Sequence, residues 1–234
     1  MSNKPTDKKP ELSETRRTFI KQSAAVWGST LLAGFGAPSI VMAQSTKIET
    51  TKAKLGFIAL TDAAPLFVGI EKGFFKKHGM PDVEVLKQSS WGTTRDNLVL
   101  GSANGGIDGA HILTPMPYLI STGAMTANNI PTPMYILARL NLGGQCISVG
   151  EEYKALKVGT DTREFKKALM AKKGGGKAVS AAMTFPGGTH DLWIRYWMAA
   201  GGIDPNNDLS TIVVPPAQMV ANMKVGSMDT FCVC

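Results

Sequence analysis

Stretches of strand length alternate with stretches of helix length along the first half of the chain. Apolar residues 54–60, 83–86 and 105–113 predict strands, and residues 62–77 and 93–100 between them predict helices. This β-α-β-α-β order is typical of a parallel sheet with helices outside it.

The second half repeats the pattern. Residues 178–184, 210–214 and 229–233 predict strands, and residues 189–200 and 217–225 predict helices. Two α/β lobes, each built on a parallel sheet, imply a ligand cleft between them.

A shared phrase supports the two-lobe reading. In each half a helix ends at a glycine, Gly101 or Gly226, and an aspartate, Asp108 or Asp229, then opens a strand. We place the crossing between lobes within residues 134–149. The predicted division is a signal over 1–43, a first lobe over 44–138 and a second lobe over 139–234.

Two further segments carry no predicted chemistry. Lys-rich residues 163–177 predict a solvated helix with a flexible end. Trp193, Tyr196 and Trp197 lie on one helix, and that spacing favours core packing over a stacking platform.

The beginning of the chain predicts export. Arg16 and Arg17 precede an uncharged stretch that holds helix-breaking glycines and Pro38 and ends at Val41-Met42-Ala43, a small-residue cleavage pattern. The paired arginines resemble a twin-arginine signal, so we expect the twin-arginine translocase to deliver a soluble protein to the periplasm. A basic helix start is the alternative. Because no cysteine lies near the junction, a lipid anchor is not expected.

Charge and cysteine content narrow the function class. Residues 1–43 carry six basic and three acidic side chains, so the formal charge falls from +7 for the whole chain to +4 for the remainder. Without basic blocks interleaved with aromatics, nucleic-acid binding is not indicated. Cys146, Cys232 and Cys234 fit neither a zinc knuckle nor a redox motif and favour buried free thiols, although a disulfide stays open.

Four phrases resemble the solute-binding proteins of ABC importers for nitrate and bicarbonate. They are Leu60–Pro65, Glu71–Phe75, Ser90–Arg95 and Thr184–His190. The second is shared by a broad superfamily, whereas Ser90–Arg95 and Thr184–His190 are more specific. The resemblance implies a two-lobed periplasmic binding protein of type II-like fold, a monomer, that delivers a small inorganic anion to ABC permease subunits.

Relatives of this kind continue beyond the last predicted strand. The chain ends on residues 231–234 without a capping helix. We therefore expect a missing C-terminal return segment, with a charged residue that helps to choose between nitrate and bicarbonate.

The resemblance also carries over four ligand contacts. Nitrate offers only acceptor oxygens, so its site should present donors and avoid carboxylates. Trp91 has an indole N–H, Gln145 an amide, Thr184 a hydroxyl and His190 a ring N–H. No catalytic or metal-binding residue is predicted.

Gly92 and Gly188 complete the predicted set. Each sits where a strand end meets a helix start, and there free backbone N–H groups attract anions. Ordinary turn chemistry explains such glycines equally well.

Each side chain also has a structural alternative. Trp91 can be a half-buried aromatic at a helix entry, and His190 a satisfied histidine at a helix start. Gln145 can pair with backbone and Thr184 can close a turn. Asp62 serves as an N-cap as readily as a site residue and is left out.

Capture of nitrate or nitrite for uptake is the predicted function, without a cofactor. Bicarbonate, for which calcium would be expected, and a small organic solute are the alternatives within binding proteins. An exported enzyme is the alternative outside them, but the chain has no GxSxG, HExxH or haem-attachment motif, and Gly174–Ala178 lacks essential P-loop residues.

Overall fold

The computed structural model describes residues 48–234. The predicted export signal lies outside this range. Within it, no helix is both long and apolar enough to cross a membrane.

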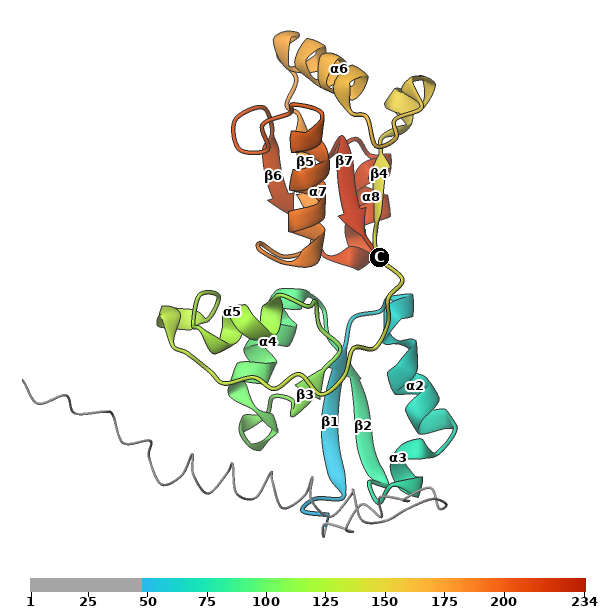
Figure 1. The fold of residues 1–234 in the computed structure, drawn as a ribbon, viewed down its shortest axis with the longest axis vertical. Coiled ribbons are helices and arrows are strands. Elements are labelled where there is room, and N and C mark those ends of the chain that lie inside the picture. Colours follow the sequence, from blue (N-terminus) through green and yellow to red (C-terminus); the bar gives the residue numbers. More distant parts are fainter. Residues whose placement is uncertain (1–47) are drawn as a thin grey trace, which may run out of the picture. The chain divides into compact units, whose positions relative to one another are not determined.

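The first sheet joins three parallel strands, β1 (Lys52–Phe57), β2 (Asp82–Lys87) and β3 (Gly109–Ala110), in the order β2-β1-β3. In Figure 1, α2 and α3 lie on one side of these strands and α4 and α5 on the other. The helices of this part are η1 (Thr61–Ala63), α2 (Ala64–Glu71), α3 (Phe74–Lys77), α4 (Trp91–Leu100), η2 (Ser102–Asn104), α5 (Met116–Ser121) and η3 (Ala127–Asn129).

Glycines change two of the predicted elements. The helix expected over 62–77 is interrupted at Gly73, whose φ of +66° is left-handed. The strand expected over 105–113 shrinks to two residues, because Gly106 and Ile107 donate their N–H groups to Gly101 and Asn97 at the end of α4. Helix α5 was not predicted.

The second sheet has four strands, β4 (Cys146–Val149), β5 (Ser180–Met183), β6 (Ser210–Val213) and β7 (Thr230–Val233), in the order β4-β7-β5-β6. The three strands that the sequence predicted, β5, β6 and β7, are parallel, and β4, which was not predicted, runs antiparallel to β7. The helices of this part are η4 (Glu151–Leu156), α6 (Arg163–Gly174), α7 (Thr189–Ala200), η5 (Pro216–Gln218) and α8 (Met219–Lys224).

Side-chain alternation gives this second sheet two buried faces. Ala181 and Cys232 join the cluster that contains residues of α6 and α7, whereas Ala182 and Phe231 join the cluster that contains Met219 of α8. The sheet is therefore the middle layer of a three-layer α/β arrangement, with α7 and α8 on opposite sides (Figure 1).

The aspartates of the shared phrase, Asp108 and Asp229, make the same kind of hydrogen bond in both halves of the chain. Asp108 accepts the backbone N–H of Lys54 at 2.8 Å, and Asp229 accepts that of Ser180 at 2.7 Å. Each carboxylate thus ties the start of one strand to its parallel neighbour. Asp229 is buried and also accepts from Lys172 at 2.6 Å.

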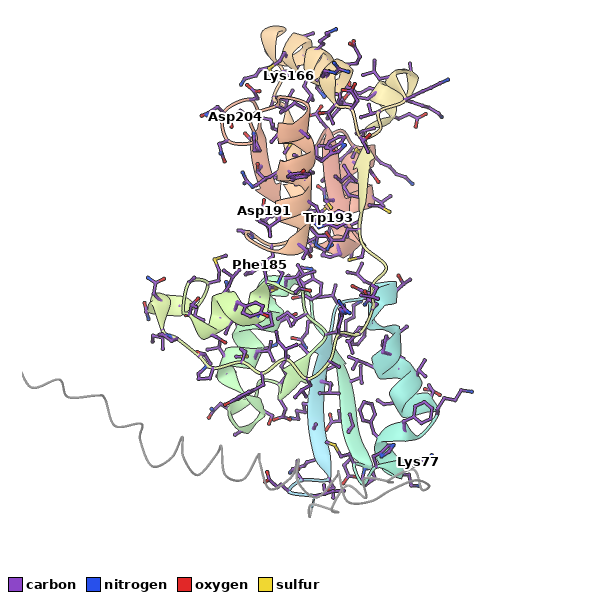
Figure 2. All side chains as sticks on the ribbon, in the orientation of Figure 1. Lys77, Lys166, Phe185, Asp191, Trp193 and Asp204 are labelled. Atoms are coloured by element: carbon purple, nitrogen blue, oxygen red, sulfur yellow. The ribbon has the colours of Figure 1, made fainter. Side chains whose placement is uncertain are left out.

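Two helix predictions need correction. Helix α6 is not simply solvated, because Phe165 and Leu169 are fully buried in the core. On α7, Trp193 (labelled in Figure 2) and Tyr196 are 49% and 79% exposed, so the core-packing expectation is wrong for both. Trp197 does pack against the core.

Candidate functional site

The first sheet brings three polar side chains to one edge. Asp62 follows the carboxyl end of β1, Trp91 follows β2 and His111 follows β3. Because the strands are parallel, their carboxyl ends share the edge where open sheets of this class bind ligands.

The second sheet also brings polar side chains to the edge where its parallel strands end. Thr184 follows the carboxyl end of β5, and Cys234 follows that of β7. Gln145 precedes β4, and the antiparallel direction of β4 places its start beside the end of β7. The reversed strand therefore positions Gln145 with the others.

Trp91 is the first residue of α4. Ser90 caps this helix by accepting the N–H of Thr93 at 3.1 Å, which fixes where the helix begins. The indole is fully buried among apolar residues that include Met116 and Phe185, and its Nε1 has no hydrogen-bond partner among the described residues. The half-buried alternative is wrong, and a donor is left available.

His111 and Asp62 form a buried pair beside Trp91. The His111 Nε2 lies 2.9 Å from the Asp62 Oδ2, and the His111 ring meets the Trp91 ring edge-on at 5.3 Å between centroids. Burial alone would raise the pKa of the Asp62 carboxyl, but the hydrogen bond and charge of His111, with a hydrogen bond from Cys234, lower it overall. Asp62 is therefore a carboxylate.

His190 lies in the first turn of α7 and is fully buried. Its Nδ1 is 2.6 Å from the Thr184 hydroxyl, and its Nε2 is 3.1 Å from the Cys234 thiol. Burial lowers the pKa of this ring to about 4, against the opposing pull of Asp62. The ring is therefore neutral near pH 7 and carries one proton. The hydrogen bonds to its two nitrogens determine whether that proton is on Nδ1 or on Nε2.

Thr184 contacts the imidazole of His190 directly. When the Thr184 hydroxyl donates to Nδ1, the ring proton of His190 is on Nε2 and faces Cys234. Thr184 thus orients a donor, and its own contact with a ligand stays a prediction.

Gln145 lies against the start of α7. Its amide nitrogen donates to the Thr189 hydroxyl, and the Cys232 thiol lies 3.9 Å from its amide oxygen. Burial raises the pKa of Cys232 and of Cys234 to about 12, so both are thiols. Cys146 is exposed, contrary to the expectation of buried cysteines, and all three are free.

The two predicted glycines differ. A Cβ on Gly188 would lie 2.8 Å from Leu113 Cδ1 and 3.1 Å from the Phe185 carbonyl oxygen, so tight packing favours glycine there. A Cβ on Gly92 would meet nothing closer than Ser90 Oγ, at 3.6 Å. Gly92 therefore has no packing reason to be glycine, and close backbone approach by a ligand stays its predicted role.

The start of α7 is less open than expected. Asp191 accepts the N–H of Gly187 at 2.8 Å and pairs with Arg195 (Figure 2 labels Asp191). A carboxylate of the chain thus already occupies a donor that the sequence suggested for an anion. One of the N–H groups expected to be free at that turn, that of Gly187, is therefore already bonded.

Sequence reasoning missed Asp62 and His111. Asp62 is not an N-cap: it lies inside η1, which begins at Thr61. Both side chains follow strand ends at the ligand-binding edge, and that position was the available signal. The carboxylate of Asp62 beside Trp91 and His111 also corrects the expectation that the site avoids carboxylates.

Comparisons place the chain in a family. The profile of the NMT1-like family matches residues 46–234. The chain belongs to the NMT1-like family. This NMT1-like chain is 71% identical over 185 residues to the nitrate/nitrite binding protein NrtA of Synechocystis sp., a match that covers 79% of the chain and 40% of that protein. It is 45% identical over 232 residues to the bicarbonate-binding protein CmpA of Synechococcus elongatus, with 92% and 51% covered.

A solved structure of a relative has the same fold as this chain. The crystal structure of the periplasmic nitrate-binding protein NrtA from Synechocystis superposes with a TM-score of 0.75 at 69% identity, covering 79% of the NMT1-like chain and 47% of that one. The α/β binding-protein fold is thereby confirmed. The NMT1-like chain spans about half or less of the length of these relatives.

Proposed function

We propose that the protein is the periplasmic substrate-binding component of an ABC importer and captures nitrate or nitrite. One observation carries the proposal: Trp91 offers a buried N–H that has no partner within residues 48–234, at the sheet edge where parallel α/β sheets bind ligands. Its support from relatives is the 71% identity to a nitrate/nitrite binding protein.

In this proposal the donors come from both sheets. Trp91 donates its indole N–H, and His190, oriented by Thr184, donates Nε2–H in place of its contact with Cys234. Gln145 turns its amide from Thr189 to the ion, and Gly92 admits the ion to backbone N–H. Gly188 contributes by allowing close packing against Leu113.

Closure of the two lobes on the ion would produce the form that docks on the permease. Such a change is driven only by tighter binding of nitrate to the closed form. We propose that the protein acts as a monomer, reaches the periplasm by the twin-arginine pathway and catalyses no reaction.

Bicarbonate is the second candidate, because one observation favours it. The Asp62 Oδ1 is a buried acceptor with no partner in the part of the chain that the structure describes, and bicarbonate, unlike nitrate, has an O–H to donate. The calcium ion expected for that branch needs several oxygen ligands. Among residues 48–234, no group of three or more His, Cys, Asp or Glu side chains could hold a metal ion.

Calorimetric titration of the purified protein with nitrate, nitrite and bicarbonate, the last with and without calcium, tests the proposal. Saturable nitrate binding that Trp91→Phe weakens supports it. Heat of binding with bicarbonate alone would instead support the second candidate function, bicarbonate binding. Absence of heat with all three anions refutes the inorganic-anion assignment.

A further inference from the structure

Among the described residues, three buried side-chain atoms have no hydrogen-bond partner. They are Asp62 Oδ1, Trp91 Nε1 and His111 Nδ1. Buried polar atoms without partners are rare in folded proteins and call for a specific explanation. These three belong to side chains that touch one another, through the 2.9 Å His111–Asp62 contact and the edge contact between the Trp91 and His111 rings. Of the three, Trp91 Nε1 and a protonated His111 Nδ1 can both donate to one anion, whereas Asp62 Oδ1 is an acceptor that nitrate cannot satisfy.

The contact with Asp62 determines which ring nitrogen of His111 is protonated, and therefore which hydrogen-bonding group faces a ligand. The carboxylate accepts only from a protonated nitrogen, so Nε2 carries a proton. In the neutral ring Nδ1 is then a bare lone pair, whereas in the imidazolium form Nδ1 is a charged donor. The same side chain therefore repels an acceptor-only anion in one state and binds it in the other.

Nitrate and nitrite have acceptor oxygens and no hydrogen to donate. A lone pair on Nδ1 would face one of those oxygens, while a proton there would bind it beside the Trp91 N–H. The Asp62 carboxylate balances the added positive charge at 2.9 Å. A buried imidazolium is thus paired on one nitrogen and bound to the anion on the other.

Resting on the proposed function, we infer that His111 is protonated in the anion-bound state and donates from Nδ1, so that nitrate capture is coupled to a proton held by the His111–Asp62 pair. His111 is then a specificity-determining residue: it selects anions without a proton of their own. Bicarbonate, which can donate to the neutral ring, does not require that proton.

The nearest titratable groups around His111, which are Asp62, Cys234 and His190, each keep one charge state near neutral pH. Asp62 from η1 has a lowered pKa, Cys234 after β7 has a pKa of about 12, and His190 on α7 has a pKa of about 4. Helix α4 brings Trp91, which does not titrate, and Arg95, which pairs with Asp96. Nitrate itself keeps its charge throughout this range.

The first test is the nitrate dissociation constant from about pH 6 to about pH 9 for the wild type, His111→Gln and His78→Gln. We expect the wild-type affinity to fall as the pH rises through this range, by up to about tenfold per pH unit. His111→Gln should bind nitrate more weakly at about pH 6 and show no slope. His78 is exposed at the end of α3, so His78→Gln should keep both the affinity and the slope.

The second test needs no variant. Titrations in buffers of different ionisation enthalpy count the protons taken up with each nitrate, and NMR of the three labelled histidines identifies the ring that gains one. At about pH 8 the His111 signals should move to the imidazolium position on nitrate addition while those of His190 keep neutral-ring values. Nitrate binding with a pH-independent affinity and a neutral His111 would overturn this inference and leave the proposed function intact. Absence of nitrate binding at every pH would overturn both.

Discussion

Replacing Trp91 by Phe separates the donor role of the indole from its packing role. The side chain is fully buried and its Nε1 has no partner among the described residues, which leaves an unsatisfied donor that costs about 1–3 kcal/mol. The smaller phenyl ring relieves that cost but loses roughly 2 kcal/mol of burial. Because the two effects oppose each other, the free energy of unfolding without nitrate should change by no more than about 1 kcal/mol.

Nitrate binding should respond differently. A hydrogen bond to a charged partner contributes about 1.5–3 kcal/mol, so Trp91→Phe should weaken nitrate binding by roughly 10- to 150-fold. Calorimetry gives the affinity, and urea unfolding with and without nitrate gives the stability. In the wild type, nitrate at about 100 times its dissociation constant should add about 2.7 kcal/mol, and at the same concentration the variant should gain only about 0.3–1.4 kcal/mol.

The control is Met116→Leu, a volume-conserving change in the same buried cluster. It should leave the nitrate affinity within about twofold while costing less than about 1.5 kcal/mol of stability. Wild-type affinity in Trp91→Phe would refute the donor role. A loss of more than about 3 kcal/mol of stability together with binding would show that packing, and not the N–H, is what Trp91 supplies.

Three further predictions follow from the same contacts. Gly188→Ala should lower the free energy of unfolding by about 1–3 kcal/mol, because its Cβ would lie 2.8 Å from Leu113, whereas Gly92→Ala should leave it equal or higher; equal losses in thermal unfolding would contradict the packing argument. His190 has a pKa of about 4 when folded and an ordinary value of 6.5, so only the unfolded chain takes up a proton as the pH falls between these values. Stability is complete above about pH 6.5 and declines by about 3 kcal/mol toward pH 4, and His190→Gln should flatten that decline; an unchanged acid limb would show that the ring is not buried neutral. Cys146 is exposed while burial raises the pKa of the other two thiols to about 12, so iodoacetamide should label Cys146 first, and C146S should lose the fast phase; fast labelling that survives in C146S would place another thiol at the surface.

Local patterns predicted the elements well where one segment determined its own limits. Helix α7 spans Thr189–Ala200 as expected, because its apolar period and flanking glycines are local signals. The aspartates of the shared phrase were recognised as strand openers, and Asp108 and Asp229 both bind the neighbouring strand. Such features need no knowledge of the rest of the fold.

Features that depend on distant partners were not predictable in the same way. The direction of β4 depends on its pairing with β7, and the exposure of Tyr196 depends on which face of α7 meets the sheet. Likewise, His111 and Asp62 look unremarkable in the chain and become a candidate site only when two strand ends meet. The donors Trp91 and His190 were found through family phrases, and their buried, partnered or unpartnered states came from the structure.

The most direct test of the central claim is the indole N–H signal of Trp91 in a two-dimensional NMR spectrum during nitrate titration, assigned with Trp91→Phe. We expect a saturable shift of that signal with the same dissociation constant that calorimetry gives, while the indole signal of exposed Trp193 stays in place. Saturable nitrate binding that leaves the Trp91 signal unmoved would contradict it.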